Sequence, residues 1–260
     1  MWGDFMPPRL HKQKDLLRKS RRIKLTGLKL LFFSITLVAM PVVHSSDTII
    51  LPEPRLDSDV SVERAIQSRR SVREFSNIPL ALAEVSQLLW SAQGLTDSKG
   101  LRSAPSAGAL YPLEVYLVAG NVTGLKAGTY QYSPDGHKLR RIKDGDSRME
   151  LATAAYKQLW IKDSAALLIF SAIAKKTTWK YGQRGIRYIH IEVGHSAQNV
   201  FLQAQSLGLD AAVVGALDDD RIKAILDLST EEQVLYLMPV GRSRTCLLYT
   251  SDAADEFCHV

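Results

Sequence analysis

Residues 68–75 read Ser-Arg-Arg-Ser-Val-Arg-Glu-Phe, which places three arginines and a serine directly after a short amphipathic run. A guanidinium group is planar, permanently charged and able to bind phosphate through paired hydrogen bonds. The segment therefore suggests a phosphate site, although most arginine clusters are solvated surfaces. The segments that follow it in the chain decide between these two interpretations.

Three later segments extend the pattern. They are 102–112 (RSAPSAGALYP), 180–199 (KYGQRGIRYIHIEVGHSAQN), and 214–220 (VGALDDD) together with 239–242 (PVGR). Small side chains at residues 105–109 would let the backbone approach a flat ring closely, and Gly215 and Ala216 end a predicted strand in the same manner. Alternatively, residues 105–109 form only a tight loop that leads into the next strand.

Together, and in this order, the four segments resemble the nitroreductase-like flavoproteins, and most closely the SagB-type dehydrogenases, which oxidise thiazolines and oxazolines in peptides. The resemblance covers roughly residues 50–244. It implies an FMN cofactor and a homodimer with the flavin at the subunit interface. PSAGALYP and the run from Lys180 to Asn199 are its specific parts.

The resemblance also implies roles for individual residues. In the family, residues of the first segment hold the phosphate, the ribityl chain and the N1/O2 edge of the ring, where positive charge stabilises the reduced flavin. The expected cofactor-binding residues are Arg69, Arg70, Ser71, Arg73, Pro105, Ser106, Gly108, Gly215, Ala216 and Arg242. The alternative for the arginines is pairing with acidic side chains at the surface.

Lys180 and Tyr181 match a Lys-Tyr pair that is proposed to remove a proton in the azoline-oxidising branch. A lysine with a lowered pKa, or a phenol, can act in this way. Alternatively, Lys180 is solvated and Tyr181 packs at a subunit contact. His190, Glu192 and His195 have no spacing typical of zinc, so we expect helix packing or a buried hydrogen bond there and no metal site.

Hydrophobic periodicity over residues 47–245 predicts one α+β domain with a central mixed or antiparallel sheet flanked by helices. The longest predicted helix is central and has an apolar stripe with spacings of three and four. Ser61 and Asp218 are predicted N-caps. The predicted helices cover 62–67, 80–93, 147–159, 186–207 and 218–226, and the predicted strands cover 113–119, 129–132, 138–142, 165–172, 211–214 and 234–240.

The two ends of the chain read as separate from this domain. Residues 1–46 combine a basic region, an apolar run and small residues, which is the pattern of an export signal. Residues 20–25 loosely match a twin-arginine leader; an ordinary basic leader and an uncleaved membrane anchor are alternatives. Residues 246–260 continue no strand and read as an unstructured, extraneous tail, or as a flexible natural terminus.

Charge and cysteine content exclude several function classes. The chain carries a net charge of +6, of which the leader contributes +7 and the tail −3, leaving +2 on the domain. The basic balance therefore gives no sign of nucleic-acid binding. Both cysteines, Cys246 and Cys258, lie in the tail. The domain thus has no cysteine nucleophile and no thiolate metal site.

The sequence therefore favours an exported, periplasmic bacterial FMN oxidoreductase that takes a hydride from a small organic or peptide-derived substrate. Nicotinamide cofactors are scarce outside the cytoplasm, which makes NAD(P)H-dependent nitro or quinone reduction the second choice. A flavin-binding protein without catalysis on the same scaffold is a third hypothesis. The substrate is not encoded in any motif that we identify.

Overall fold

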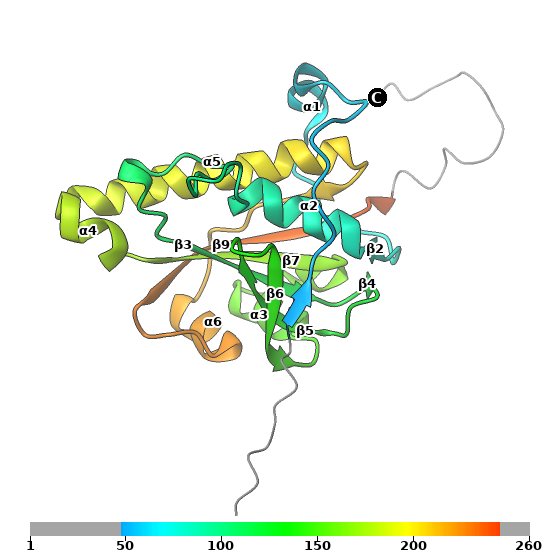
Figure 1. Ribbon diagram of the computed structural model, residues 1–260. Helices are drawn as coiled ribbons and strands as arrows, with labels where there is room; N and C mark the ends of the chain where they lie inside the picture. The colour runs from blue at the N-terminus through cyan, green and yellow to red at the C-terminus, as the bar shows by residue number, and fades with distance from the viewer. Residues whose placement is uncertain (1–47, 245–260) are drawn as a thin grey trace, which may run out of the picture. The chain divides into compact units, whose positions relative to one another are not determined.

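The computed structural model describes residues 48–244 (Figure 1). The predicted export signal and the predicted tail lie outside these residues, and they stay predictions. Among the helices of residues 48–244, none is long and apolar enough to cross a membrane.

A seven-stranded sheet forms the centre of the domain, in the order β1-β6-β5-β3-β7-β9-β8. All of its strand pairs are antiparallel. The strands are β1 (Thr48–Ile50), β3 (Leu113–Ala119), β5 (Gly128–Ser133), β6 (Lys138–Asp144), β7 (Ala166–Ile173), β8 (Asp210–Ala211) and β9 (Glu232–Gly241). A second, parallel pair joins β2 (Leu80–Ala81) to β4 (Val122–Thr123). The predicted α+β class is confirmed.

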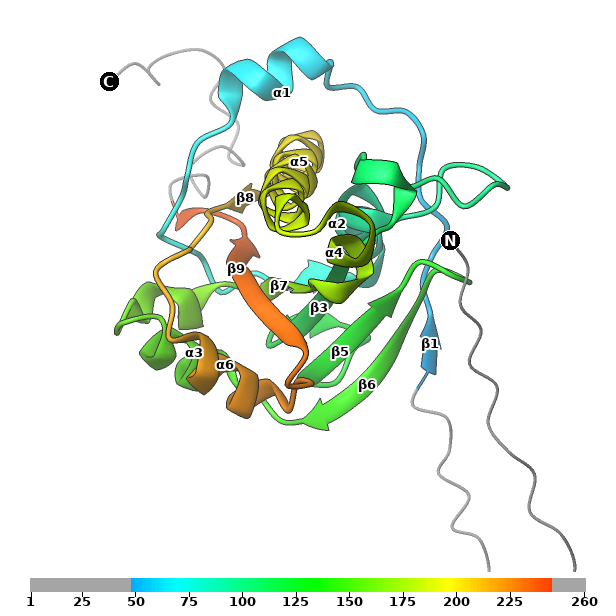
Figure 2. The ribbon, with the colours of Figure 1, turned by 90° about the vertical axis from the view of Figure 1, so that its left-hand side faces the viewer.

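Helices cover both faces of the sheet (Figures 1 and 2). One face carries α2 (Leu82–Gln93), α4 (Lys175–Tyr181) and α5 (Arg184–Ser206), with α1 (Val62–Ser68) lying over α5, and the other carries α3 (Arg148–Ala154) and α6 (Asp219–Leu226). Strand β7 is buried on both sides because its side chains alternate between two cores. Leu168 and Phe170 join the core beneath α5, whereas Leu167 and Ile169 join the core beneath α3 and α6.

The long predicted helix is confirmed as α5, which has 23 residues. Its buried residues follow the predicted apolar stripe, with Glu192 and Ser196 among them. Gly208, with φ of 64°, follows its last turn. The two predicted N-caps are also confirmed, since Ser61 accepts a hydrogen bond from Arg64 N and Asp218 accepts one from Arg221 N.

The predicted helix over 147–159 is too long. Helix α3 ends at Ala154, and Tyr156 and Lys157 adopt left-handed backbone angles with φ of 52° and 61°. Such angles end a helix. A short 3-10 helix over Leu159–Asp163 follows. The predicted helix over 80–93 begins two residues later, at Leu82, because residues 80–81 pair with β4 instead.

The predicted strand over 211–214 is only partly regular, and Pro239 is the reason. Ala212 N and Val214 N donate to the carbonyls of Pro239 and Leu237, which continues the register of β8 against β9. Leu237 N returns a bond to Val214, but proline has no N–H to return one to Ala212. The chain therefore follows β9 to residue 214 with an interrupted ladder.

Candidate functional site

The predicted phosphate-binding segment lies at the β8–β9 edge of the sheet. Val72 N donates to Ala211 O over 3.0 Å, and Ser76 N donates to Arg242 O over 2.8 Å. Residues 69–73 therefore run beside the start of the 211–216 segment and the end of β9. The structure thus brings together the predicted arginines, Ser71 and the strand that leads to Gly215.

Arg69, Arg70 and Arg73 form no ion pair within residues 48–244. The Arg69 guanidinium lies 5.1 Å from the ring centre of Phe201, and that of Arg73 lies 5.7 Å from the ring centre of Trp160. An aromatic face holds a guanidinium in place without cancelling its charge. Arg70 Nη1 instead donates to the carbonyls of Gln67 and Arg69. None of the three charges is thus compensated by an acidic side chain within residues 48–244.

Arg242 has a different environment from the other predicted cations. Its Nη2 lies 2.6 Å from Glu84 Oε1, and the two side chains are only 30% and 16% exposed. Glu84 also accepts a hydrogen bond from Ala81 N at the start of α2. The charge of Arg242 is thus already compensated, and the predicted contact of Arg242 with phosphate requires its release from Glu84.

The loop with the small side chains meets the predicted catalytic pair. Gly108 has φ of 65°, and a Cβ placed on it would stand 2.7 Å from the Tyr181 hydroxyl and 2.9 Å from Lys180 Nζ. Lys180 Nζ lies 5.4 Å from the Tyr181 ring centre, and Tyr181 packs edge-on against Tyr188. Pro105 and Gly108 are exposed, and Ser106 is half-buried. A side chain at position 108 would displace the ends of the Tyr181 and Lys180 side chains, and the positive φ also favours glycine there.

Gly215 and Ala216 are exposed and follow the last paired residue of the 211–214 segment. A Cβ on Gly215 would stand 3.4 Å from the Tyr236 ring, which is an ordinary contact. Their backbone is therefore accessible. From Ala211 to Gly215 the extended chain covers about 13 Å, so the segment leads from the arginines toward a more distant point on the surface.

Glu192 is a residue of this region to which the sequence assigned no role at the site. It is 2% exposed, and its Oε2 accepts a hydrogen bond from Ser106 Oγ over 2.6 Å. Burial raises the pKa of its carboxyl to about 7, against the opposing effects of Ser106 and Arg102. The expected buried hydrogen bond is present at Glu192, whereas His190 and His195 are exposed. The available signal was an acid placed between Ile189 and Val193 on the apolar stripe.

The predicted residues form two groups that lie on opposite sides of α5. The arginine group contains Arg69, Arg70, Ser71 and Arg73, and the Gly108 group contains Ser106, Gly108, Lys180 and Tyr181. Ser106 bonds to Glu192, whereas Arg69 lies over Phe201. These two helix positions are about two and a half turns apart, so their side chains leave the helix in opposite directions. Figure 2, which looks along α5, shows the chain after α1 descending beside β8 and the loop before β3 on the other side.

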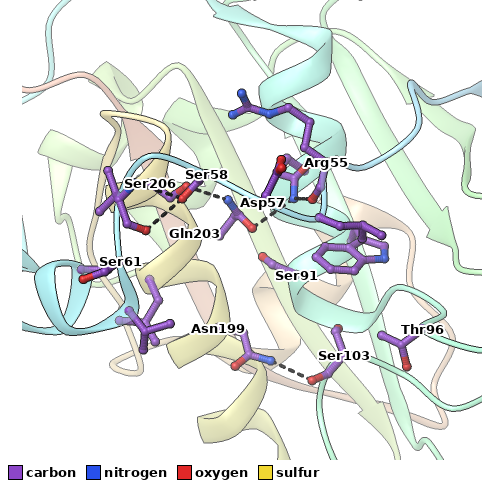
Figure 3. Close-up of a pocket in the computed structure, with 17 residues that line it drawn as sticks. Arg55, Asp57, Ser58, Ser61, Ser91, Thr96, Ser103, Asn199, Gln203 and Ser206 are labelled. Carbon is purple, nitrogen blue, oxygen red and sulfur yellow. Dashed lines mark hydrogen bonds between the residues drawn. The ribbon is translucent and has the colours of Figure 1, made fainter.

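A cavity of about 600 Å³ lies between residues 55–65, α2 and α5 (Figure 3). Its lining includes none of the predicted site residues, and its polar groups largely satisfy one another. Gln87 Nε2 donates to Gln203 Oε1, and Asn199 Nδ2 donates to Ser103 O. The cavity is thus separate from both groups, although Ser103 and Asn199 belong to two of the family-like segments.

Comparison with known proteins gives the family. Residues 66–242 match the family model described as the nitroreductase family. The chain belongs to the nitroreductase family. Its members are flavin-dependent oxidoreductases, so the chain is an enzyme of that kind. Among residues 48–244, no three metal-ligating side chains cluster together.

Individual relatives support this placement. "Putative nitroreductase MJ1384" of Methanocaldococcus jannaschii is 46% identical over 196 residues, which is 75% of this chain and 98% of that protein. The microcin B17-processing protein McbC of Escherichia coli is 30% identical over 57% of each chain. A crystal structure from Anabaena variabilis, with the same description as MJ1384, has a TM-score of 0.64 and 30% identity, over 70% of this chain and 38% of its own.

The residues of the site fit a phosphorylated flavin. Three guanidinium groups without acidic partners are suited to a phosphate, and Gly108 leaves open a space that any other side chain would fill. Gly215 and Ala216 add accessible backbone. The arginine group is cationic, which suits the cofactor's phosphate, and the 105–109 loop has small, neutral side chains, which suit its ring.

Proposed function

We propose that this enzyme is an FMN-dependent dehydrogenase or oxidase of the SagB type that oxidises a small organic or peptide-derived substrate. The observation that carries the proposal is the meeting of Gly108 with Lys180 Nζ and the Tyr181 hydroxyl. A lysine and a phenol at the edge of a flavin loop suit removal of a proton from a substrate that loses a hydride. The relative McbC, which processes microcin B17, favours a peptide-derived substrate.

Each group has its own task in this proposal. Arg69, Arg70, Ser71 and Arg73 would hold the phosphate and ribityl chain, and Arg242 would join them after leaving Glu84. Pro105, Ser106, Gly108, Gly215 and Ala216 would lie against the ring. FMN, when bound, supplies an acceptor for the two electrons of a hydride.

The reaction balances with one proton removed by the protein. The substrate loses a hydride from carbon and a proton from the adjacent atom, and a double bond forms between them. Lys180 and Tyr181 would accept that proton and pass it to solvent, since Lys180 is exposed. Oxygen or a quinone would take up the two electrons and complete the cycle.

We also propose that the enzyme acts as a homodimer. Because the arginine group and the Gly108 group lie on opposite sides of α5, one subunit would supply the phosphate end of a site and the other subunit its Lys-Tyr pair. The exposed side of α5 includes Ile191, which is 48% exposed, and Gly194, beside which there is open space. Such a surface would allow two copies of α5 to approach closely.

The export-signal pattern of residues 1–46 supports a periplasmic location, where a dehydrogenase or oxidase is favoured over an NAD(P)H-driven reductase. The test is the absorbance of the purified protein with FMN, followed by anaerobic bleaching with candidate donors. We expect bound yellow flavin, bleaching by an azoline-containing peptide or related donor, and recovery of colour with oxygen or a quinone. Bleaching by NADPH alone would favour the nitroreductase alternative. A flavin that no donor bleaches would point to a binding protein without catalysis.

A further inference from the structure

Glu192 is a buried acid that packing does not require. One carboxylate oxygen accepts the Ser106 hydroxyl, and the other, Oε1, is buried and has no hydrogen-bond partner within residues 48–244. Of its buried helix neighbours one turn away, Ile189 is apolar and Ser196 donates its hydroxyl to Ala92 O, so neither offers a hydrogen bond to Glu192 Oε1. A buried carboxylate costs free energy unless its oxygens are satisfied. An acid kept at such a position requires an explanation other than stability.

The loop that Glu192 touches has strained backbone. Gly108, Ala109 and Tyr111 have φ of 65°, 53° and 46°, and left-handed angles cost alanine and tyrosine about 1 kcal/mol or more each. Ser106 closes this turn, because its carbonyl accepts Ala109 N and its Oγ accepts Tyr111 N, each over 3.0 Å. A strained loop of this kind persists only where its surroundings hold it.

The hydrogen bond between the loop and the helix has a fixed direction: Ser106 donates and Glu192 accepts. A hydroxyl has a single proton, which Ser106 donates to Glu192. Its lone pairs are then free to accept Tyr111 N. If Glu192 carried a proton instead, the Ser106 O–H would face a neutral carboxyl group, and the hydrogen bond between them would lose its charge assistance and weaken. The ionised carboxylate therefore stabilises the observed loop more than the neutral acid does.

We propose that Glu192 is a positioning residue: through Ser106 it fixes the 106–111 loop, and so sets where Gly108 stands against Lys180 and Tyr181. The importance of that placement for turnover depends on the proposed function, whereas the link itself does not. When Glu192 is ionised the loop is held, and when it is protonated the loop is released. The placement of the Lys-Tyr pair against the loop therefore changes with pH in the range where Glu192 titrates.

Few charged or titratable groups face Glu192 within residues 48–244. From the loop, the Arg102 guanidinium opposes protonation; it is held by Gln93 Oε1 of α2 over 3.0 Å and stacks on Tyr111 at 4.5 Å. From α5 itself, Tyr188 and His195 lie one turn before and one turn after Glu192. Arg102, which lies just before the 106–111 loop, thus favours the ionised form of this carboxyl.

The test follows the Tyr111 amide proton in the flavin-free protein by NMR hydrogen exchange between pH 5.5 and 8.5. In the wild type we expect protection, relative to the intrinsic rate, to rise about tenfold across pH 7. In Glu192→Gln we expect exchange at least tenfold faster above pH 7 and no such rise. Ser196→Ala is the matched control, since Ser196 is also buried on α5 but donates to Ala92 O of α2. It should leave Tyr111 unchanged.

Unchanged Tyr111 protection in Glu192→Gln would overturn the proposal. If Glu192→Gln does not fold, Ser106→Ala removes the same link from the loop side, and a protected Tyr111 amide in that variant would overturn it equally. With FMN bound, Glu192→Gln should lower kcat more than it raises KM and remove a pH transition near 7. A response of Tyr111 in a protein that binds no FMN would refute the proposed function and leave the positioning role standing.

Discussion

At the scale of single residues, Gly108 is a position where an added side chain would meet both Lys180 and Tyr181. We expect Gly108→Ala to lower turnover at least tenfold, because its methyl group would stand within 3 Å of Tyr181 and Lys180 and push them from the loop. Gly124→Ala is the matched control: Gly124 has φ of 80° but open space around it. In both variants the left-handed backbone angle destabilises the folded protein by the same amount, about 1 kcal/mol. Equal turnover in the two variants would show that the contact with Lys180 and Tyr181 is unimportant.

The carboxyl of Glu192 gives a second prediction at this scale, about stability. Its pKa is raised from 4.5 to about 7, so the folded state holds a proton that the unfolded state has released between these values. The free energy of unfolding therefore falls as pH rises from 4.5 to 7, by about 3 kcal/mol, and is level above pH 7. Urea unfolding across this range should show that fall in the wild type and lose it in Glu192→Gln. If the fall of unfolding free energy with pH remained in Glu192→Gln, a different titratable group would be its cause.

At the scale of elements, His137 joins three parts of the fold. Its Nδ1 lies 2.8 Å from Tyr132 Oη of β5, and its Nε2 lies 2.6 Å from Ser86 Oγ of α2 and 3.1 Å from the Pro52 carbonyl after β1. The pattern fits a neutral ring whose Nε2 carries the proton. Burial lowers the pKa of His137, against the opposing effects of Pro52 and Glu53.

We therefore expect His137 to stabilise the protein most in its neutral form. Its contribution is fully present above the unfolded-state pKa of 6.5 and is lost as pH falls through the lower folded-state pKa. At pH 7.5, His137→Gln should cost about 1 kcal/mol from lost hydrogen bonds, and less at pH 5. The measurement is the difference in unfolding free energy between wild type and variant at each pH. A difference that grows toward acid pH would contradict the assignment. Exposed His190→Gln serves as the control.

At the scale of the whole molecule, the placement of the two residue groups on opposite sides of α5 predicts complementation between subunits. Arg69→Ala/Arg73→Ala should lack the phosphate end, and Lys180→Ala should lack the catalytic pair. If each site is shared, a mixed dimer rebuilds one intact site from its two wild-type halves. Co-expressed variants should then recover about a quarter of wild-type activity. If proven mixed dimers recover no activity, the proposal that each site is shared between two subunits is wrong.

The spacing of apolar residues along the chain explains how much of the fold the sequence predicted. The spacing of Ile189, Val193 and Ala197 predicts α5, and the continuous apolar run of β7 predicts a strand buried on both faces, because each pattern shows which faces of a single element are buried. The overlong helix after residue 147 marks the limit of this signal. Nothing in the spacing of apolar residues reveals the left-handed turn at Tyr156.

The sequence by itself determined the family-like segments, the helix caps and the residue types suited to a flavin, since each depends on residues near one another in the chain. The tertiary structure alone decided which of these residues meet. It brought Gly108 to Lys180 and Tyr181, joined Arg242 to Glu84, and turned Ser106 toward Glu192. These contacts join residues more than 70 positions apart, and only the packing of α2, α4 and α5 on one sheet sets their distances and charges.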